Sequence, residues 1–147
     1  IQVNPTSTTE YTVTVSFGEG CLFTKSDTIA VEGNVVRDSG NAGFNTLRNI
    51  IECAIDGDTI TYDFPNVNGT TLTSEILINK NLLIDALILA KPEISIDYNT
   101  ALEGMIIATN KKLTLNNIDV KINNHNNQNV FAGSGQVIIS GNTYITD

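Results

Sequence analysis

The sequence contains no tryptophan, one histidine and two cysteines, and aromatic residues make up only 6% of its 147 residues. The one histidine, His125, lies in the Asn-rich segment 123–127, so we predict an exposed turn residue rather than part of a catalytic triad or a two-histidine metal site. Basic residues are also scarce, eight against sixteen acidic ones, and the longest basic run is Lys111-Lys112. Because nucleic-acid binding needs clustered cations, we expect no nucleic-acid partner.

Long apolar runs and a signal-peptide pattern are absent as well, so the sequence predicts neither a membrane-spanning helix nor a leader. Ile1 opens directly into strand-like sequence, which we interpret as an internal cut in a longer chain whose export signal lies outside these residues. The net charge of −8 comes from scattered acidic residues, and we interpret it as a solubility feature rather than a cation-binding one.

The two cysteines, Cys21 and Cys53, are neither in a CxxC motif nor near a histidine at ligand spacing, so we expect no metal site and no cofactor. In an exported protein the two thiols can form one disulfide, whereas in a cytosolic protein they would be inert core residues. Cys21 can equally pair with a cysteine in a preceding segment. The 21–53 bridge is therefore a candidate disulfide with open alternatives.

What the sequence has in quantity is Thr, Asn, Ile and Val, which is typical of many short strands joined by polar turns and argues against a helical bundle. In residues 1–32, apolar and polar residues alternate in Tyr11–Val15 and again in Asp27–Val31, with a turn at Gly18-Glu19-Gly20. This pattern predicts an antiparallel hairpin. Because two strands alone are not stable in water, we expect the hairpin to belong to a sheet that is incomplete here.

The sequence of this segment resembles the last two strands of Ig-like repeats in very large surface proteins of Bacteroidota. The residues that carry the resemblance are Val3-Asn4-Pro5-Thr6, Tyr11–Val15, Gly20-Cys21 and the strand to Val31. The resemblance covers about the first fifth of the chain. It implies that residues 1–32 are the C-terminal strands of an Ig-like β-sandwich.

After residue 33 the pattern changes. Phe44, Leu47, Ile50, Ile51 and Ala54 recur at helical spacing, which predicts a short amphipathic helix over about 44–54 that ends at a turn over 56–58. The turn Asp56-Gly57-Asp58 lacks the further ligands of a calcium loop. From residue 59 onward the apolar residues come in short runs between Asn, Gly, Lys and Asp. These runs are 76–78, 82–84, 87–89, 94–96, 105–107, 113–115, 118–120 and 137–139.

The short runs repeat. A shift of 24 residues places 105–108 over 129–132 and 113–115 over 137–139, and a second match places 80–84 over 111–115. About three strands in each period predicts a parallel β-helix, in which every coil buries its inward residues against the coils above and below. Because alternate strand residues share a face, we predict one set of side chains to point inward. The set is Ile78, Ile84, Leu89, Leu115, Val120 and Ile139.

The segment 41–54 followed by Gly57-Asp58-Thr59-Ile60-Thr61-Tyr62-Asp63 resembles the "GxxSLRxAIxxAxxGDTIxF" opening of bacterial right-handed β-helix repeat proteins. Here Asn45-Thr46 replaces the usual Gly-Ser of that motif. The resemblance implies an all-β fold over 33–147, a right-handed parallel β-helix of about four coils whose N-terminal end is capped by the short helix. It is specific for the fold and weak for activity.

The search for catalytic residues yields none. A glycan lyase or hydrolase would need convergent carboxylates or a base beside calcium, whereas Asp63, Asp85, Asp97 and Asp119 occur singly. The match of 80–84 with 111–115 is a shift of 31 residues. This shift aligns Asp85 with Asn116 and Asp119 with Ile88, so we predict that Asp85 and Asp119 are not stacked. The sequence Asn68-Gly69-Thr70 forms a glycosylation sequon, which we interpret as a hairpin turn.

Two classes of function remain. The first is a non-enzymatic, adhesin-like stalk or terminal module of a secreted cell-surface protein, and the second is a truncated carbohydrate-active β-helix enzyme. We favour the first. The resemblance implies type IX export, as in gliding adhesins, and an extracellular, outer-membrane-associated location. Expected partners are other domains of the same long chain, an outer-membrane β-barrel of the secretion machinery, and surface glycans.

Overall fold

The computed structural model describes residues 9–17, 21–29, 33–86, 91–97, 103–123 and 129–146. The chain divides into two units, residues 1–33 and 34–147, and each is described by itself. Several predicted features lie outside the described residues: the turn at 18–20, the apolar run 87–89 with Leu89, and His125.

The first unit contains an antiparallel pair, β1 (Thr9–Phe17) and β2 (Cys21–Ile29). Its register places Val13 opposite Lys25, and the Oγ atoms of Thr12 and Ser26 lie 2.8 Å apart across the pair. The predicted hairpin is thus confirmed, with a second strand that begins at Cys21 rather than Asp27. Val13 is 60% exposed, and among the described residues the pair has no third strand. Completion of an Ig-like sheet stays a prediction.

The second unit consists of three parallel sheets whose strands follow one another in turn along the chain. The first sheet contains β3 (Val35–Val36), β4 (Thr59–Tyr62), β7 (Leu82–Asp85), β10 (Lys112–Asn116) and β13 (Gln136–Ser140). The second contains β5 (Gly69–Leu72), β8 (Glu93–Asp97), β11 (Asp119–Asn123) and β14 (Ile145–Thr146). The third contains β6 (Ile76–Ile78), β9 (Met105–Ile107) and β12 (Phe131–Gly133).

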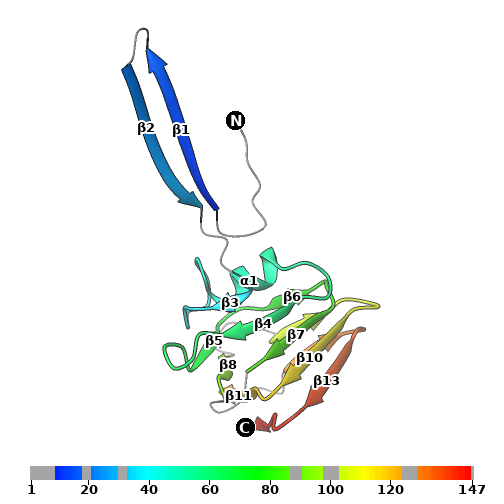
Figure 1. Cartoon of the computed structure of the whole chain (residues 1–147). Coiled ribbons are helices and arrows are strands. Elements are labelled where there is room, and N and C mark those ends of the chain that lie inside the picture. The colour runs from blue at the N-terminus through cyan, green and yellow to red at the C-terminus, as the bar shows by residue number, and fades with distance from the viewer. Residues whose placement is uncertain are drawn as a thin grey trace. The chain divides into compact units, whose positions relative to one another are not determined.

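Each strand therefore pairs with the equivalent strand of the preceding and following coils, as the ladder of β4, β7, β10 and β13 shows (Figure 1). The result is a parallel β-solenoid of about four turns, which confirms the predicted parallel coils. The predicted right-handedness stays a prediction.

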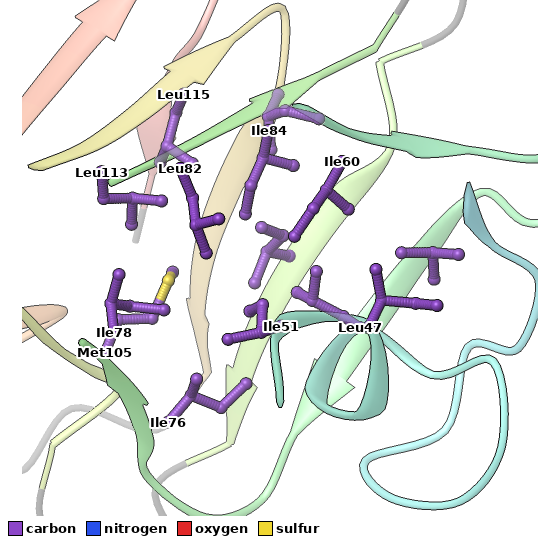
Figure 2. Close-up of a cluster of buried hydrophobic side chains, with 14 of the residues drawn as sticks. Leu47, Ile51, Ile60, Ile76, Ile78, Leu82, Ile84, Met105, Leu113 and Leu115 are labelled. Carbon is purple, nitrogen blue, oxygen red and sulfur yellow. The ribbon is translucent and has the colours of Figure 1, made fainter. Parts of the chain in front are cut away.

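The core of the solenoid is a set of aliphatic stacks that run from coil to coil (Figure 2). Ile60, Ile84 and Leu115 lie in register on β4, β7 and β10, and all three side chains are fully buried. Strand alternation explains the burial, because every second residue points into the coil while its neighbours point to solvent. The predicted inward residues Ile78, Ile84, Leu115 and Val120 are buried, which confirms them.

The helix α1 (Leu47–Cys53) is shorter than the predicted 44–54. Thr46 is its N-cap and accepts a hydrogen bond from the Asn49 backbone N–H, while the Asn49 side chain accepts one from the Asn45 N–H. Leu47, Ile50 and Ile51 are buried in the core at the N-terminal end of the solenoid. Figure 2 shows Leu47 and Ile51 among the core side chains. The prediction for Phe44 is wrong, because it precedes this cap in a turn and is 75% exposed.

Asn45 and Thr46 shape the start of the helix. Asn45 has a φ of 61°, a left-handed conformation that glycine adopts readily and that asparagine tolerates better than most residues. Thr46 supplies the hydroxyl that an N-cap needs. The two residues thus set the start of the helix.

Two register predictions are corrected. Met105 pairs with Phe131, not with Asn129, so the shift of 24 residues holds for β10 and β13 but not for β9 and β12. Gly69 begins the parallel strand β5 and pairs with Glu93, so the segment 68–70 is not a hairpin turn.

Candidate functional site

The cysteines were the only site residues that the sequence singled out. Cys53 is the last residue of α1, is exposed, and carries a free thiol. Cys21 is the first residue of β2, and its side chain lies outside the described part of the chain. Because the two residues belong to separate units, a bridge between them stays a prediction.

The acidic residues form contacts between coils that the sequence did not reveal. Asp85 pairs with Asn116 as predicted, and the Asn116 side-chain amide donates to Asp85 Oδ1 at 3.0 Å. Ser140 then donates to Asn116 Oδ1 at 3.1 Å, which extends a polar ladder across three coils. Such side-chain bonds along the stack add specificity to the backbone pairing of successive coils.

The predicted pairing of Asp119 with Ile88 is wrong, because the register places Asp119 beside Glu93 on the next strand. Two carboxylates therefore do occupy neighbouring coils. Each has its own partner: Lys91 Nζ lies 3.6 Å from Asp119 Oδ1, and the Ser95 hydroxyl donates to Glu93 Oε1. Within the described residues there is no group of three or more His, Cys, Asp or Glu side chains that could hold a metal ion. No described helix is long and apolar enough to cross a membrane.

Arg48 has a role that the sequence reasoning missed. From α1 its guanidinium donates through Nε to the Asn41 carbonyl at 3.0 Å and through Nη2 to the Ser74 carbonyl at 2.7 Å. Nη1 donates to the Glu75 carbonyl, and Nη2 also reaches the side chains of Asn41 and Ser74. Partial burial lowers the pKa of Arg48, and Glu52 opposes that effect. Arg48 thus connects the loop before α1 to the turn between β5 and β6.

The turn after the helix contains a second connection between coils. Asp56 accepts hydrogen bonds from the Asn81 backbone N–H at 2.8 Å and from the Asn81 amide at 2.9 Å, and Lys111 Nζ lies 2.9 Å from Asp56 Oδ1. The backbone bond from Asn81, with the Lys111 and Asn81 side chains, lowers the pKa of Asp56 from 3.8 to about 2. Asn81 in turn accepts from the Lys112 N–H at 3.0 Å, so the turns of three coils are linked.

This depressed pKa predicts an acid-dependent loss of stability. The contribution is fully present above the ordinary value of 3.8 and is lost as the pH falls through about 2, because protonation removes the anionic acceptor. We expect the midpoint temperature of the wild type to fall over this interval, and to fall less in Asp56→Asn, when both are measured by circular dichroism. Equal acid dependence of the two proteins would contradict the role of Asp56.

In the last coil that the structure describes, two inward side chains are less buried than their partners one coil earlier. Ile139 pairs with Leu115, and Ile145 pairs with Val120, so both occupy inward positions. Leu115 and Val120 are fully buried, whereas Ile139 is 42% and Ile145 46% exposed. Among the described residues no strand pairs with the outer edges of β12, β13 and β14. Residues 129–146 also contain no Asp, Glu, Lys, Arg or His, although the whole chain has a net charge of −8. We call these residues the terminal coil.

The chain is thus a mostly β protein, a parallel β-solenoid of about four turns with one short helix and an N-terminal two-stranded antiparallel sheet. No protein-family model, curated protein or solved structure matches it.

Proposed function

We propose that this chain is a non-enzymatic module of a large secreted bacterial cell-surface protein, with an adhesin-like role as part of a stalk or as a terminal domain. The observation that carries the proposal is the terminal coil, whose inward side chains Ile139 and Ile145 are half exposed while their partners one coil earlier are fully buried. An apolar cross-section with unpaired strand edges is a surface that proteins normally cover.

The chemistry of the terminal coil favours a partner that also supplies strands. The edges of β12, β13 and β14 offer backbone N–H and C=O groups to a parallel strand, and the exposed aliphatic side chains offer a stacking surface. The absence of charged residues in 129–146 removes electrostatic repulsion from such a contact. We propose another domain of the same long chain as the occupant, and an outer-membrane β-barrel of the secretion machinery as the second partner.

The resemblance of residues 1–32 to Ig-like repeats of Bacteroidota surface proteins supports an extracellular, outer-membrane-associated location and type IX export. The continuous stacking of the coils fits a role as part of a stalk. Each coil is joined to the next by parallel backbone pairing and by side-chain bonds such as Asn116 to Asp85 and Asn81 to Asp56. Each coil of such a structure is stabilised by its contacts with the neighbouring coils.

Photo-crosslinking on intact cells tests the proposal. A photoreactive amino acid replaces Ile139 in the terminal coil, and the matched control replaces Leu83, a half-buried outward position on β7. We expect crosslinks from position 139 to a segment of the same polypeptide or to an outer-membrane protein, and few from position 83. We also expect protease added to intact cells to digest the protein.

Three results would overturn the proposal: full protection of the protein until the cells are lysed, equal crosslinking from positions 139 and 83, or turnover of a polysaccharide by the purified chain. The last result would instead support the carbohydrate-active alternative.

A further inference from the structure

A polar cavity lies on the outer face of β5 and β8, away from the terminal coil. Its volume is about 330 Å³. Its lining comes from three places in the chain: the loop before α1, the connection from β4 to β5, and the outward side of β5 and β8. The lining is mostly polar, and its side chains include those of Ser39, Asn68, Thr71, Glu93 and Ser95.

The backbone at Gly69 helps to create the cavity. Gly69 pairs with Glu93, and Glu93 pairs with Asp119, so the three residues occupy equivalent positions in successive coils. The carboxylates of Glu93 and Asp119 point outward. Gly69 has a φ of +157°, and a Cβ built there would lie 2.2 Å from the Glu93 carbonyl oxygen. No side chain fits at this position, because it would meet the Glu93 backbone, and Gly69 itself lines the cavity.

The neighbouring backbone fixes the walls. The Thr71 N–H donates to the Ser39 carbonyl at 3.2 Å, which holds the loop before α1 against the free edge of β5. The Glu93 N–H donates to the Asn68 carbonyl at 3.0 Å, which holds the other wall against β8. The floor of the cavity is therefore formed by strands of the solenoid, and its walls are loops that backbone hydrogen bonds hold against β5 and β8.

The chemistry of the lining is that of hydroxyl and amide groups. Among the described residues, the side chains of Ser39, Asn68 and Thr71 have no hydrogen-bond partner. Hydroxyls and primary amides both donate and accept hydrogen bonds. Glu93 adds one acidic acceptor, which is oriented by the Ser95 hydroxyl. The lining contains no Lys or Arg side chain.

We propose that this cavity binds a neutral carbohydrate group. The mixed donor and acceptor lining suits sugar hydroxyls, which also donate and accept. The Glu93 carboxylate, with no lining cation beside it, disfavours phosphate, sulfate and uronate groups. The polar lining disfavours an apolar ligand. The inference deepens the adhesin-like role proposed above and rests on it for the biological source of the sugar, a glycan on a cell surface.

A titration of the purified full chain tests the site. The probes are neutral hexasaccharides of glucose and of mannose, with an oligogalacturonate of similar length as the charged comparison. Amide chemical shifts recorded by NMR report where each probe binds. We expect a neutral probe to shift the amides of Asn68, Thr71 and Ser95, and the oligogalacturonate to leave them unchanged.

Thr71→Val removes one hydroxyl and keeps the side-chain shape, and Thr114→Val is the matched control on the outward side of β10. We expect Thr71→Val to weaken the affinity about fivefold and Thr114→Val to leave it unchanged. No shift with any neutral probe, shifts located elsewhere, or equal affinity of the two variants would overturn the proposal. Oligogalacturonate binding at the same amides would overturn the choice of a neutral ligand. This assay uses purified protein, so a negative result would not contradict the proposal of a surface module. In the same way, a negative crosslinking result would not contradict a measured affinity for a sugar.

Discussion

Ile84→Ala is expected to lower the free energy of unfolding of the solenoid by about 3 kcal/mol, because it deletes a fully buried side chain from the middle of a coil-to-coil stack. Ile84 lies in register between Ile60 on β4 and Leu115 on β10, and both neighbours are also fully buried. A cavity at this place removes contacts with two coils at once. Parallel pairing on both sides of β7 limits how far the backbone can close the cavity.

The matched control is Leu83→Ala on the same strand. Leu83 is half-buried on the outward side of β7, so its loss is expected to cost less than about 1 kcal/mol. Urea unfolding of the full chain, followed by far-ultraviolet circular dichroism, measures both variants. Equal destabilisation by the two substitutions would contradict the inward and outward assignment of alternate residues.

This alternation is also the part of the fold that the sequence predicted best. Apolar runs such as 82–84 and 113–115 are too short for helices, and their flanking Asn and Lys residues separate them into strands of similar length. Their repetition predicted parallel stacking, and the register of Leu82 with Leu113 confirms the 31-residue match at that sheet.

Unequal turn lengths explain why the predicted pairings of Met105 and Asp119 are wrong. Met105 precedes Leu113 by eight residues, whereas Phe131 precedes Val137 by six, so a single shift cannot align both strands. The same limitation misplaced Asp119 on Ile88 rather than beside Glu93. A sliding comparison assumes equal turns, but a solenoid keeps its strands in register and lets the turns vary.

The candidate surfaces were harder to predict for a different physical reason. The strand β5 contains Gly69, Thr70 and Thr71 with a single leucine, so its hydrophobic pattern is weak. The polar cavity then depends on Ser39 meeting Thr71 across a distance of 32 residues in the sequence. Ile139 was predicted to point inward, and its pairing with Leu115 places it at an inward position, although its side chain is 42% exposed.

Arg48 also had a signal in the sequence, since it stands at the arginine of the "SLRxAI" motif, but its partners lie in a turn 26 and 27 residues further along the chain. Its guanidinium donates to three backbone carbonyls, those of Asn41, Ser74 and Glu75. Only a planar group with several N–H donors can reach all three at once. Arg48 therefore connects the N-terminal cap to the first coil.

We expect Arg48→Ala to lower the free energy of unfolding by about 2 to 4 kcal/mol, because it leaves several carbonyls at the cap without their charged donor. Arg48→Lys should recover less than half of this loss, since an ammonium group cannot reproduce the fork geometry. The control is Arg37→Ala, whose guanidinium is partly exposed and lies 3.8 Å from Asp63 Oδ2, and whose loss should cost less than about 1 kcal/mol.

Hydrogen exchange separates a local role of Arg48 from a general one. The Thr73 N–H donates to the Asn41 side chain that Arg48 also contacts, so its exchange should accelerate in Arg48→Ala. The Leu115 amide, in the fully buried centre of β10, should respond only to global unfolding. If Thr73 keeps its wild-type protection, or if Arg48→Lys restores full stability, Arg48 does not hold the cap through its several N–H donors. In that case the packing of Leu47, Ile50 and Ile51 alone would be enough to fix α1 on the solenoid.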